Sequence, residues 1–145
     1  MENERRLVTH SSIDALVITR TQLLSLYNEI AVHPPQVGDT TVPALLQRFC
    51  ESLIDYTATA HFKLYQYFDE KRERRRAVLD VAEKAFPRIS QCTDSILKFN
   101  DKYDHPEIIH DDDKLANLKT DLSNLGETLA DRIELEDKVI SAMVS

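Results

Sequence analysis

The chain has 145 residues, enough for one domain around one sizeable hydrophobic core, and we expect residues 1–145 to form that single domain. Its net charge of -7 and its pI of about 5.2 argue against nucleic acid as a direct ligand and favour a basic partner. With 2 glycines and no tryptophan, the sequence has little material for β-hairpins or glycine-rich phosphate loops.

The apolar runs and the cysteines predict a cytoplasmic protein. The first ten residues are charged and contain no apolar run, so no signal peptide is expected. No apolar stretch approaches the roughly 18 residues that a membrane-spanning helix needs, so no membrane contact is expected. Cys50 and Cys92 are not spaced as Cys-x-x-Cys, and we interpret them as free thiols in a reducing compartment.

The first apolar pattern predicts a helix that is capped by Ser11 or Ser12. The helix should end before the Pro34–Pro35 pair, because a residue that precedes proline is displaced from the α region. Arg20 falls midway along its apolar stripe, which consists of Ile13, Leu16, Leu23, Tyr27 and Ile30.

A second helix is predicted from Val42 or Pro43 to Glu70, and it is the element around which the chain is organised. Its apolar stripe is Leu46, Cys50, Leu53, Thr57, Leu64 and Phe68, widened by Ile54 and Ala60. His61 lies at the edge of this stripe. A candidate partner-binding face, on which carboxylates surround an aromatic ring, lies outside it and consists of Glu51, Asp55 and Phe62, with Ala58 and Tyr65 nearer the border.

A run of charges, EKRERRR at 70–76, separates this helix from the next. It can be a solvated helix end or linker, or a basic patch that meets an acidic partner. The third helical pattern resumes at Ala77 and continues to Tyr103, and it carries Asn100 on its buried side. Pro87 should kink or break it near Phe86, because proline removes a backbone hydrogen bond.

The last helix is predicted to begin at the acidic triplet 111–113, where one carboxylate caps the helix and the others oppose the helix dipole. Glu136 stands on its stripe where an apolar residue is expected, among Leu115, Leu118, Leu122, Leu125, Leu129, Ile133, Ile140 and Met143. Four long helical patterns with short connectors predict an all-α fold, an antiparallel four-helix bundle with a kinked or broken third helix.

Three stripes carry one strongly polar residue each, namely Arg20, Asn100 and Glu136, and His61 borders a fourth. Because a buried charge is costly unless it is paired, we expect Arg20 and Glu136 to meet, with His61 or Tyr65 within reach. This polar cluster can fix the register of the helices, or it can shape one end of the bundle into a recognition pocket.

A metal or catalytic site in the bundle is the remaining alternative. A di-iron bundle needs Glu-x-x-His pairs on two helices, and the only such pair here, Glu107 with His110, lies in a connector. No nucleophile–His–acid set can be identified either. We therefore expect neither a metal nor another cofactor, and no enzymatic activity.

Two stretches, 48–68 and 122–140, resemble the signature helices of the Rsd/AlgQ family, bacterial regulators that bind the housekeeping sigma factor of RNA polymerase. The first carries Asp55-Tyr56 followed by His61-Phe62 and Tyr65, and the second carries Leu135-Glu136-Asp137 after Gly126, Leu129 and Arg132. Similar residues in the first and third helices extend the resemblance over nearly the whole chain.

The resemblance implies an all-α, cytoplasmic anti-sigma factor that sequesters a sigma-70-type factor, chiefly through its region 4. It also implies that a phosphotransferase carrier protein, HPr, can be a second partner. It makes Asp55 a sigma contact, with Phe62 and its neighbours lining that surface.

The chain departs from the family pattern in the first helix, where Asp14-Ala15-Leu16-Val17 stands in place of Asp-Arg-Trp-Leu. The departure leaves open which sigma factor is bound. Two alternative functions also remain, a helical-bundle sensor that binds a ligand or metal, and an adaptor for a metabolic carrier protein.

Overall fold

The secondary structure of the described chain consists of helices, as the sequence predicts. The computed structural model describes the backbone of residues 2–145 and the side chains of residues 11–145, and it contains no strand in that range. The helices are α1 (Glu2–Val32), α2 (Val42–Ala60), the π-helical turn η1 (His61–Tyr65), α3 (Gln66–Asp69), α4 (Arg76–Tyr103) and α5 (Asp112–Val144). Because α2, η1 and α3 follow one another without a gap, they form one rod.

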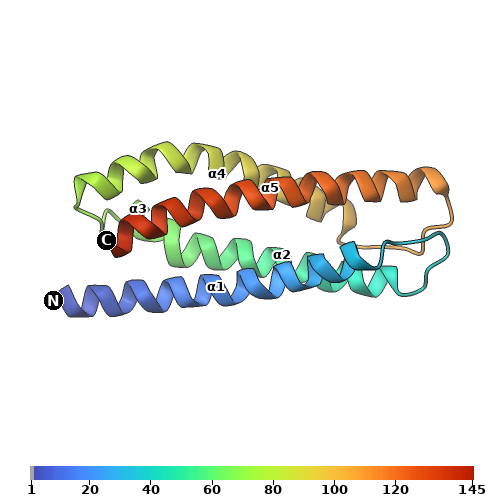
Figure 1. Cartoon of the computed structure of the whole chain (residues 1–145), viewed down its shortest axis with the longest axis horizontal. Coiled ribbons are helices and arrows are strands. Elements are labelled where there is room, and N and C mark those ends of the chain that lie inside the picture. Colours follow the sequence, from blue (N-terminus) through green and yellow to red (C-terminus); the bar gives the residue numbers. More distant parts are fainter. Residues whose placement is uncertain (1) are drawn as a thin grey trace.

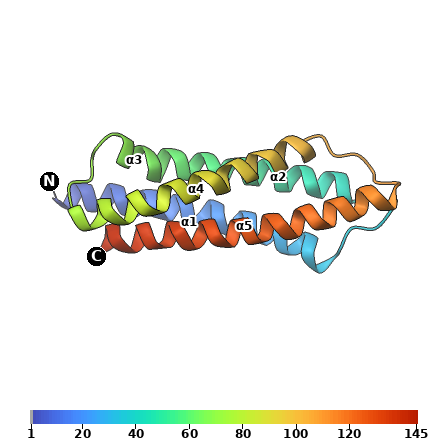
Figure 2. The same ribbon diagram turned by 90° about the horizontal axis from the view of Figure 1, so that it is seen from above.

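α1, the rod formed by α2 to α3, α4 and α5 all lie along one long axis, and each runs in the opposite direction to the one before it (Figures 1 and 2). Both ends of the chain lie at the end of the molecule where α3 connects to α4. The connectors 33–41 and 104–111 lie at the opposite end. α1 packs mainly on α2 and α4 mainly on α5, so the molecule consists of two helical hairpins that face each other.

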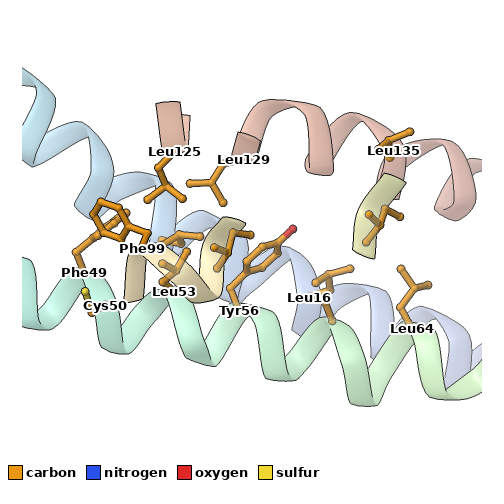
Figure 3. Packing of buried hydrophobic residues seen from close by; sticks show 14 of the residues in the cluster. Leu16, Phe49, Cys50, Leu53, Tyr56, Leu64, Phe99, Leu125, Leu129 and Leu135 are labelled. Carbon is orange, nitrogen blue, oxygen red and sulfur yellow. The ribbon is translucent and has the colours of Figure 1, made fainter. Parts of the chain in front are cut away.

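A core of leucine and aromatic side chains fills the space between the hairpins. Leu23 and Leu53 are inaccessible to solvent, and the rings of Phe49 and Phe99 meet edge to face at 5.9 Å between centroids. In Figure 3, Leu125 and Leu129 of α5 lie opposite Leu53 of α2. Burying side chains of this size contributes about 1.5–3 kcal/mol each, which is what holds the two hairpins together.

The buried face of α2 is wider than the predicted stripe. It includes Phe49 and Tyr56, both fully buried, whereas Ile54 is 37% exposed and Thr57 is half-buried. The prediction that Ile54 widens the buried stripe is therefore wrong. An aromatic residue with a polar tip can take a core position when its hydroxyl finds a partner, and Tyr56 does so.

After Leu129, the buried residues of α5 differ in part from those that the apolar pattern predicts. Arg132 and Val139 are fully buried, whereas the predicted core residues Ile133 and Ile140 are only half-buried. The reason is that a guanidinium with a buried carboxylate partner can occupy a core position. The sequence pattern alone assigns such a residue to the surface.

Helix starts agree only in part with the prediction. α1 begins at Glu2, so Ser11 and Ser12 lie inside the helix and the predicted cap is wrong. Residues 2–10 contain no proline or glycine to interrupt the helix. The predicted cap of α5 is confirmed, since the Asp111 side chain accepts a hydrogen bond of 2.8 Å from the backbone N–H of Asp113.

Of the predicted kink or break near Phe86, the break is wrong, because α4 is continuous through Pro87. The helix is bowed along its length in Figure 1. Pro87 has no N–H to offer the carbonyl of Glu83, and both residues are exposed. Water can therefore satisfy that carbonyl, which explains how the helix continues across the proline.

The charged run between α3 and α4 is not simply solvated. Glu73 is 5% exposed and accepts hydrogen bonds from the Tyr67 hydroxyl at 3.0 Å and from Arg75 Nε at 3.0 Å. Arg75 Nη2 in turn donates to the carbonyl of Met143 at 2.8 Å. The link therefore fastens the start of α4 to the last turn of α5.

Candidate functional site

A buried polar cluster lies where the two hairpins meet, and the Glu136 carboxylate is at its centre. Glu136 is fully buried on α5 and accepts hydrogen bonds from side chains of α1, α2, η1 and its own helix. Its donors are Arg20 Nη2 of α1 at 3.1 Å, the Tyr56 hydroxyl of α2 at 2.6 Å, the Tyr65 hydroxyl of η1 at 2.7 Å and Arg132 Nε of α5 at 3.0 Å. The network therefore links both hairpins through a single carboxylate.

Two guanidinium groups balance the carboxylates of this cluster. Arg132 has no solvent exposure, and its guanidinium lies over the rings of Tyr56 and Tyr65, at 5.1 and 5.7 Å from their centroids. Arg20 also reaches outward, where its Nη1 donates to Asp137 at 2.8 Å. Arg20 and Arg132 thus face two carboxylates, and the cluster has no net charge.

Burial controls the acid–base behaviour of the tyrosines. Desolvation, followed by the negative charge of Glu136, raises the pKa of Tyr56 and of Tyr65 well above that of free tyrosine. Burial by itself lowers the pKa of Arg132, but Tyr65, Tyr56 and Glu136 outweigh it and the pKa is raised. Both hydroxyls therefore remain protonated donors and Arg132 remains a cation.

The structure brings together three of the residues that the sequence predicts for this cluster. Arg20 and Glu136 meet as expected, and Tyr65 is within reach. His61 is exposed, and its ring packs against Phe62, 5.1 Å between centroids, rather than against the cluster. Asn100 is half-buried and forms no side-chain hydrogen bond with the cluster in the described part of the chain.

The sequence analysis did not predict that Tyr56, Arg132 and Asp137 belong to the polar cluster. Arg132 and Glu136 are four residues apart on one helix, a spacing that pairs opposite charges, and this signal was available. Tyr56 lies three residues beyond the buried Leu53, so helical spacing could have placed it in the core as well.

The π-helical turn η1 was not predicted, although π-turns within α-helices are frequent at functional sites. Its last residue, Tyr65, is hydrogen-bonded to Glu136 and to Arg132 Nη2, at 2.7 and 3.2 Å. Its second residue, Phe62, is 63% exposed. The turn thus joins the buried cluster to an exposed aromatic ring.

The face predicted to bind a partner is exposed along α2 and η1. Glu51, Asp55, Ala58 and Phe62 are exposed, whereas Tyr65 is half-buried and directs its hydroxyl to Glu136. These residues recur at three- and four-residue intervals, so they share one side of the rod.

A cavity of about 530 Å³ separates this face from α4, and we call it the α2–α4 cavity. Its apolar lining comes from α2 and η1 on one side and from α4 on the other, and includes Ile54, Ala58, Phe62, Phe86, Ile89 and Leu97. Tyr65 and Arg132 of the cluster also border it. A larger groove of about 890 Å³ is lined mainly by α5, but its charged residues, Glu134, Asp137 and Lys138, are all exposed.

Other kinds of site find little support among the described residues. They contain no group of three or more His, Cys, Asp or Glu side chains placed to hold a metal ion. None of their helices is both long and apolar enough to cross a membrane. Cys50 and Cys92 are free, and burial raises the pKa of Cys50 to about 11, which leaves its thiol protonated and unreactive.

Comparison with known proteins agrees with the resemblance seen in the sequence. Residues 2–144 match the family described as "Regulator of RNA polymerase sigma(70) subunit, Rsd/AlgQ". The chain belongs to the Rsd/AlgQ family. "Regulator of sigma D" of Yersinia enterocolitica is 32% identical over 131 residues, which is 88% of this chain and 77% of that protein. "Regulator of sigma D" of Enterobacter sp. (strain 638) is 31% identical over 131 residues, 89% of this chain and 78% of that protein. No solved structure matches the chain.

The fold clarifies how this member of the Rsd/AlgQ family departs from the pattern in α1. Leu16, which the sequence resemblance aligns with a tryptophan of the family pattern, is 1% exposed and belongs to the core. Ala15, in place of arginine, is half-buried, and Val17 is exposed. In this chain the altered tryptophan position therefore contributes to packing and not to an exposed surface.

Proposed function

We propose that this protein is a cytoplasmic anti-sigma factor that binds region 4 of the housekeeping sigma factor and withholds it from RNA polymerase. The observation that carries the proposal is the exposed face of α2 and η1 in a chain of the Rsd/AlgQ family. On that face the carboxylates of Glu51 and Asp55 lie on the same side as the exposed ring of Phe62. No chemistry on the partner is needed, because occupying region 4 suffices to block it.

The chemistry of the face suits a basic helical partner. An exposed aromatic ring is a typical anchor at a protein interface, and surrounding carboxylates attract and orient a basic surface. Ile54 and Leu97, 37% and 40% exposed, extend the apolar area around the α2–α4 cavity. A DNA-binding module such as region 4 presents the complementary positive charge.

The test is calorimetric titration of the full chain with isolated region 4 of its host's housekeeping sigma factor at two salt concentrations. Saturable binding that weakens as salt rises is expected, because the surface charges are screened. Absence of binding by the folded protein contradicts the proposal. If HPr is a second partner for this face, as the family resemblance implies, it should compete with region 4.

Asp55→Ala should weaken binding to region 4 by roughly tenfold, a typical effect for a contact near the centre of an interface. Its melting temperature should stay unchanged, because Asp55 is exposed. Glu83→Ala, which removes an exposed carboxylate of α4 outside this face, is the matched control and should bind normally. Unfolding of Asp55→Ala, or equal loss in both variants, would show that Asp55 is not a specific contact.

A further inference from the structure

The buried cluster leaves two guanidinium donors without a hydrogen-bond partner, Arg20 Nε and Arg132 Nη1, and of these two residues only Arg132 borders the α2–α4 cavity. Arg132 donates from Nε to Glu136 and from Nη2 to Tyr65, but its Nη1 is buried and has no hydrogen-bond partner. A buried donor of a charged group without a partner is costly, and native structures seldom keep one without a reason. Arg132 is fully buried, and it borders the α2–α4 cavity.

The charge balance of the cluster restricts what kind of molecule can meet this donor. Arg20 and Arg132 are already balanced by Glu136 and Asp137. An additional buried anion would have no counter-ion within the cluster, and an unpaired buried charge is strongly unfavourable. A neutral group with a hydrogen-bond acceptor, such as a carbonyl, suits Nη1 without that cost.

The rest of the cavity is suited to an apolar body. Phe86 packs edge to face against Tyr65 at 5.2 Å between centroids, and Ile89 of the same wall is buried. The hydroxyls of Thr57 and Thr93 donate to carbonyls of their own helices, so they need no ligand. The volume of about 530 Å³ is within the range of about 300–1,000 Å³ typical of small-molecule sites.

From these observations we infer that the α2–α4 cavity binds a small neutral molecule with an apolar body and one carbonyl-type acceptor, which accepts a hydrogen bond from Arg132 Nη1. The inference does not depend on the proposed sigma partner, because it concerns the isolated chain. It does place the ligand beside Phe62 and Ala58, which line the same cavity. A bound molecule would therefore adjoin the face proposed to bind the partner.

Three probes of similar shape test the inference on the full chain. They are 4-phenylbutan-2-one, which is neutral with a carbonyl, butylbenzene, which lacks an acceptor, and 4-phenylbutanoate, which is an anion. Binding is followed by the methyl signals of Ile54, Ile89 and Leu97 in NMR titrations, with Leu24 and Ile133 of the α5 groove as reference signals.

The ketone should bind saturably and about tenfold more tightly than butylbenzene, because a hydrogen bond from a charged donor is worth about that factor. Hydrophobic transfer alone predicts the opposite order, since butylbenzene is the more apolar molecule. Weaker binding of 4-phenylbutanoate than of the ketone is also expected. Equal or tighter binding of either comparison probe, or shifts confined to the reference signals, would overturn the inference.

A matched pair of variants locates the site without disturbing the cluster. Ser90 and Ser95 are both exposed residues of α4, but only Ser90 lines the cavity. Ser90→Phe should abolish ketone binding by filling the cavity, whereas Ser95→Phe should bind as the unmodified chain does. Binding that survives in Ser90→Phe, or is lost in both variants, would refute this location.

Discussion

Replacing Glu136 by glutamine is the most severe test of the buried cluster. The substitution keeps the size of the side chain but removes the negative charge that faces Arg20 and Arg132. Arg132 has no exposure to water, so its charge is left without compensation inside the protein. Breaking a buried ion pair by removing one partner typically costs about 3–5 kcal/mol.

That cost is a large share of the stability of a single domain, which is about 5–15 kcal/mol. With a shift of about 2–4 °C per kcal/mol, typical of domains of roughly 150 residues or more, the melting temperature should fall by on the order of 10 °C. Urea unfolding followed by circular dichroism gives the free energy directly. A constant slope with denaturant would show that the folded state itself has been destabilised.

Asp137→Asn is the control, because it removes the outer partner of Arg20 at a position where the side chain is 56% exposed. An exposed ion pair is worth less than about 1 kcal/mol, so this variant should be nearly as stable as the unmodified protein. The double variant Arg132→Met with Glu136→Leu should be more stable than Glu136→Leu alone, because it removes the uncompensated cation. A cost of Glu136→Gln no larger than that of the control would refute the central role of this carboxylate.

Three further outcomes are expected. Gly126→Ala should destabilise the protein by about 1–3 kcal/mol, because a Cβ there would clash with the Tyr27 hydroxyl, which donates to the carbonyl of Leu122; an unchanged melting temperature would contradict this. Glu136→Leu should unfold at higher temperature than Glu136→Ala, since alanine adds a cavity to the lost ion pair, and equal values would argue against a well-packed site. Because burial raises the pKa of Tyr56 and Tyr65, their contribution to stability is complete below about pH 10 and is lost as pH rises further. An ultraviolet titration of tyrosinate should show both ionising only as the protein unfolds, and ordinary titration in the folded state would disprove it.

The all-helical fold could be predicted because helical spacing of leucines is a strong signal. In α5 the steps from Leu115 to Leu129 are three or four residues, and every one of these leucines is buried. The meeting of Arg20 with Glu136 could also be predicted, since each interrupts an apolar stripe and a buried charge requires a partner. Both inferences rest on patterns within single helices.

The rest depends on how helices face one another, which a single sequence does not specify. The apolar stripe of the last helix does not include Arg132, because the sequence does not show that Glu136 and two tyrosine rings surround it. A regular α-helix puts His61 at the edge of the apolar stripe, whereas the π-helical turn that begins at His61 changes the direction of the side chains along it. No residue type marks a π-helical turn in a sequence as clearly as proline or glycine marks the end of a helix.

The same turn has a consequence for how members of the family are aligned. A π-turn closes its hydrogen-bonded ring with one residue more than an α-turn, so η1 is equivalent to a single inserted residue in a long helix. Removing one residue from 61–65 would convert the rod from Val42 to Asp69 into a uniform α-helix, with the core positions on both sides still in register. A relative can therefore be one residue shorter here and keep the same bundle. A single-residue gap at this position would indicate a relative that lacks the π-turn, and with it the present placement of Phe62.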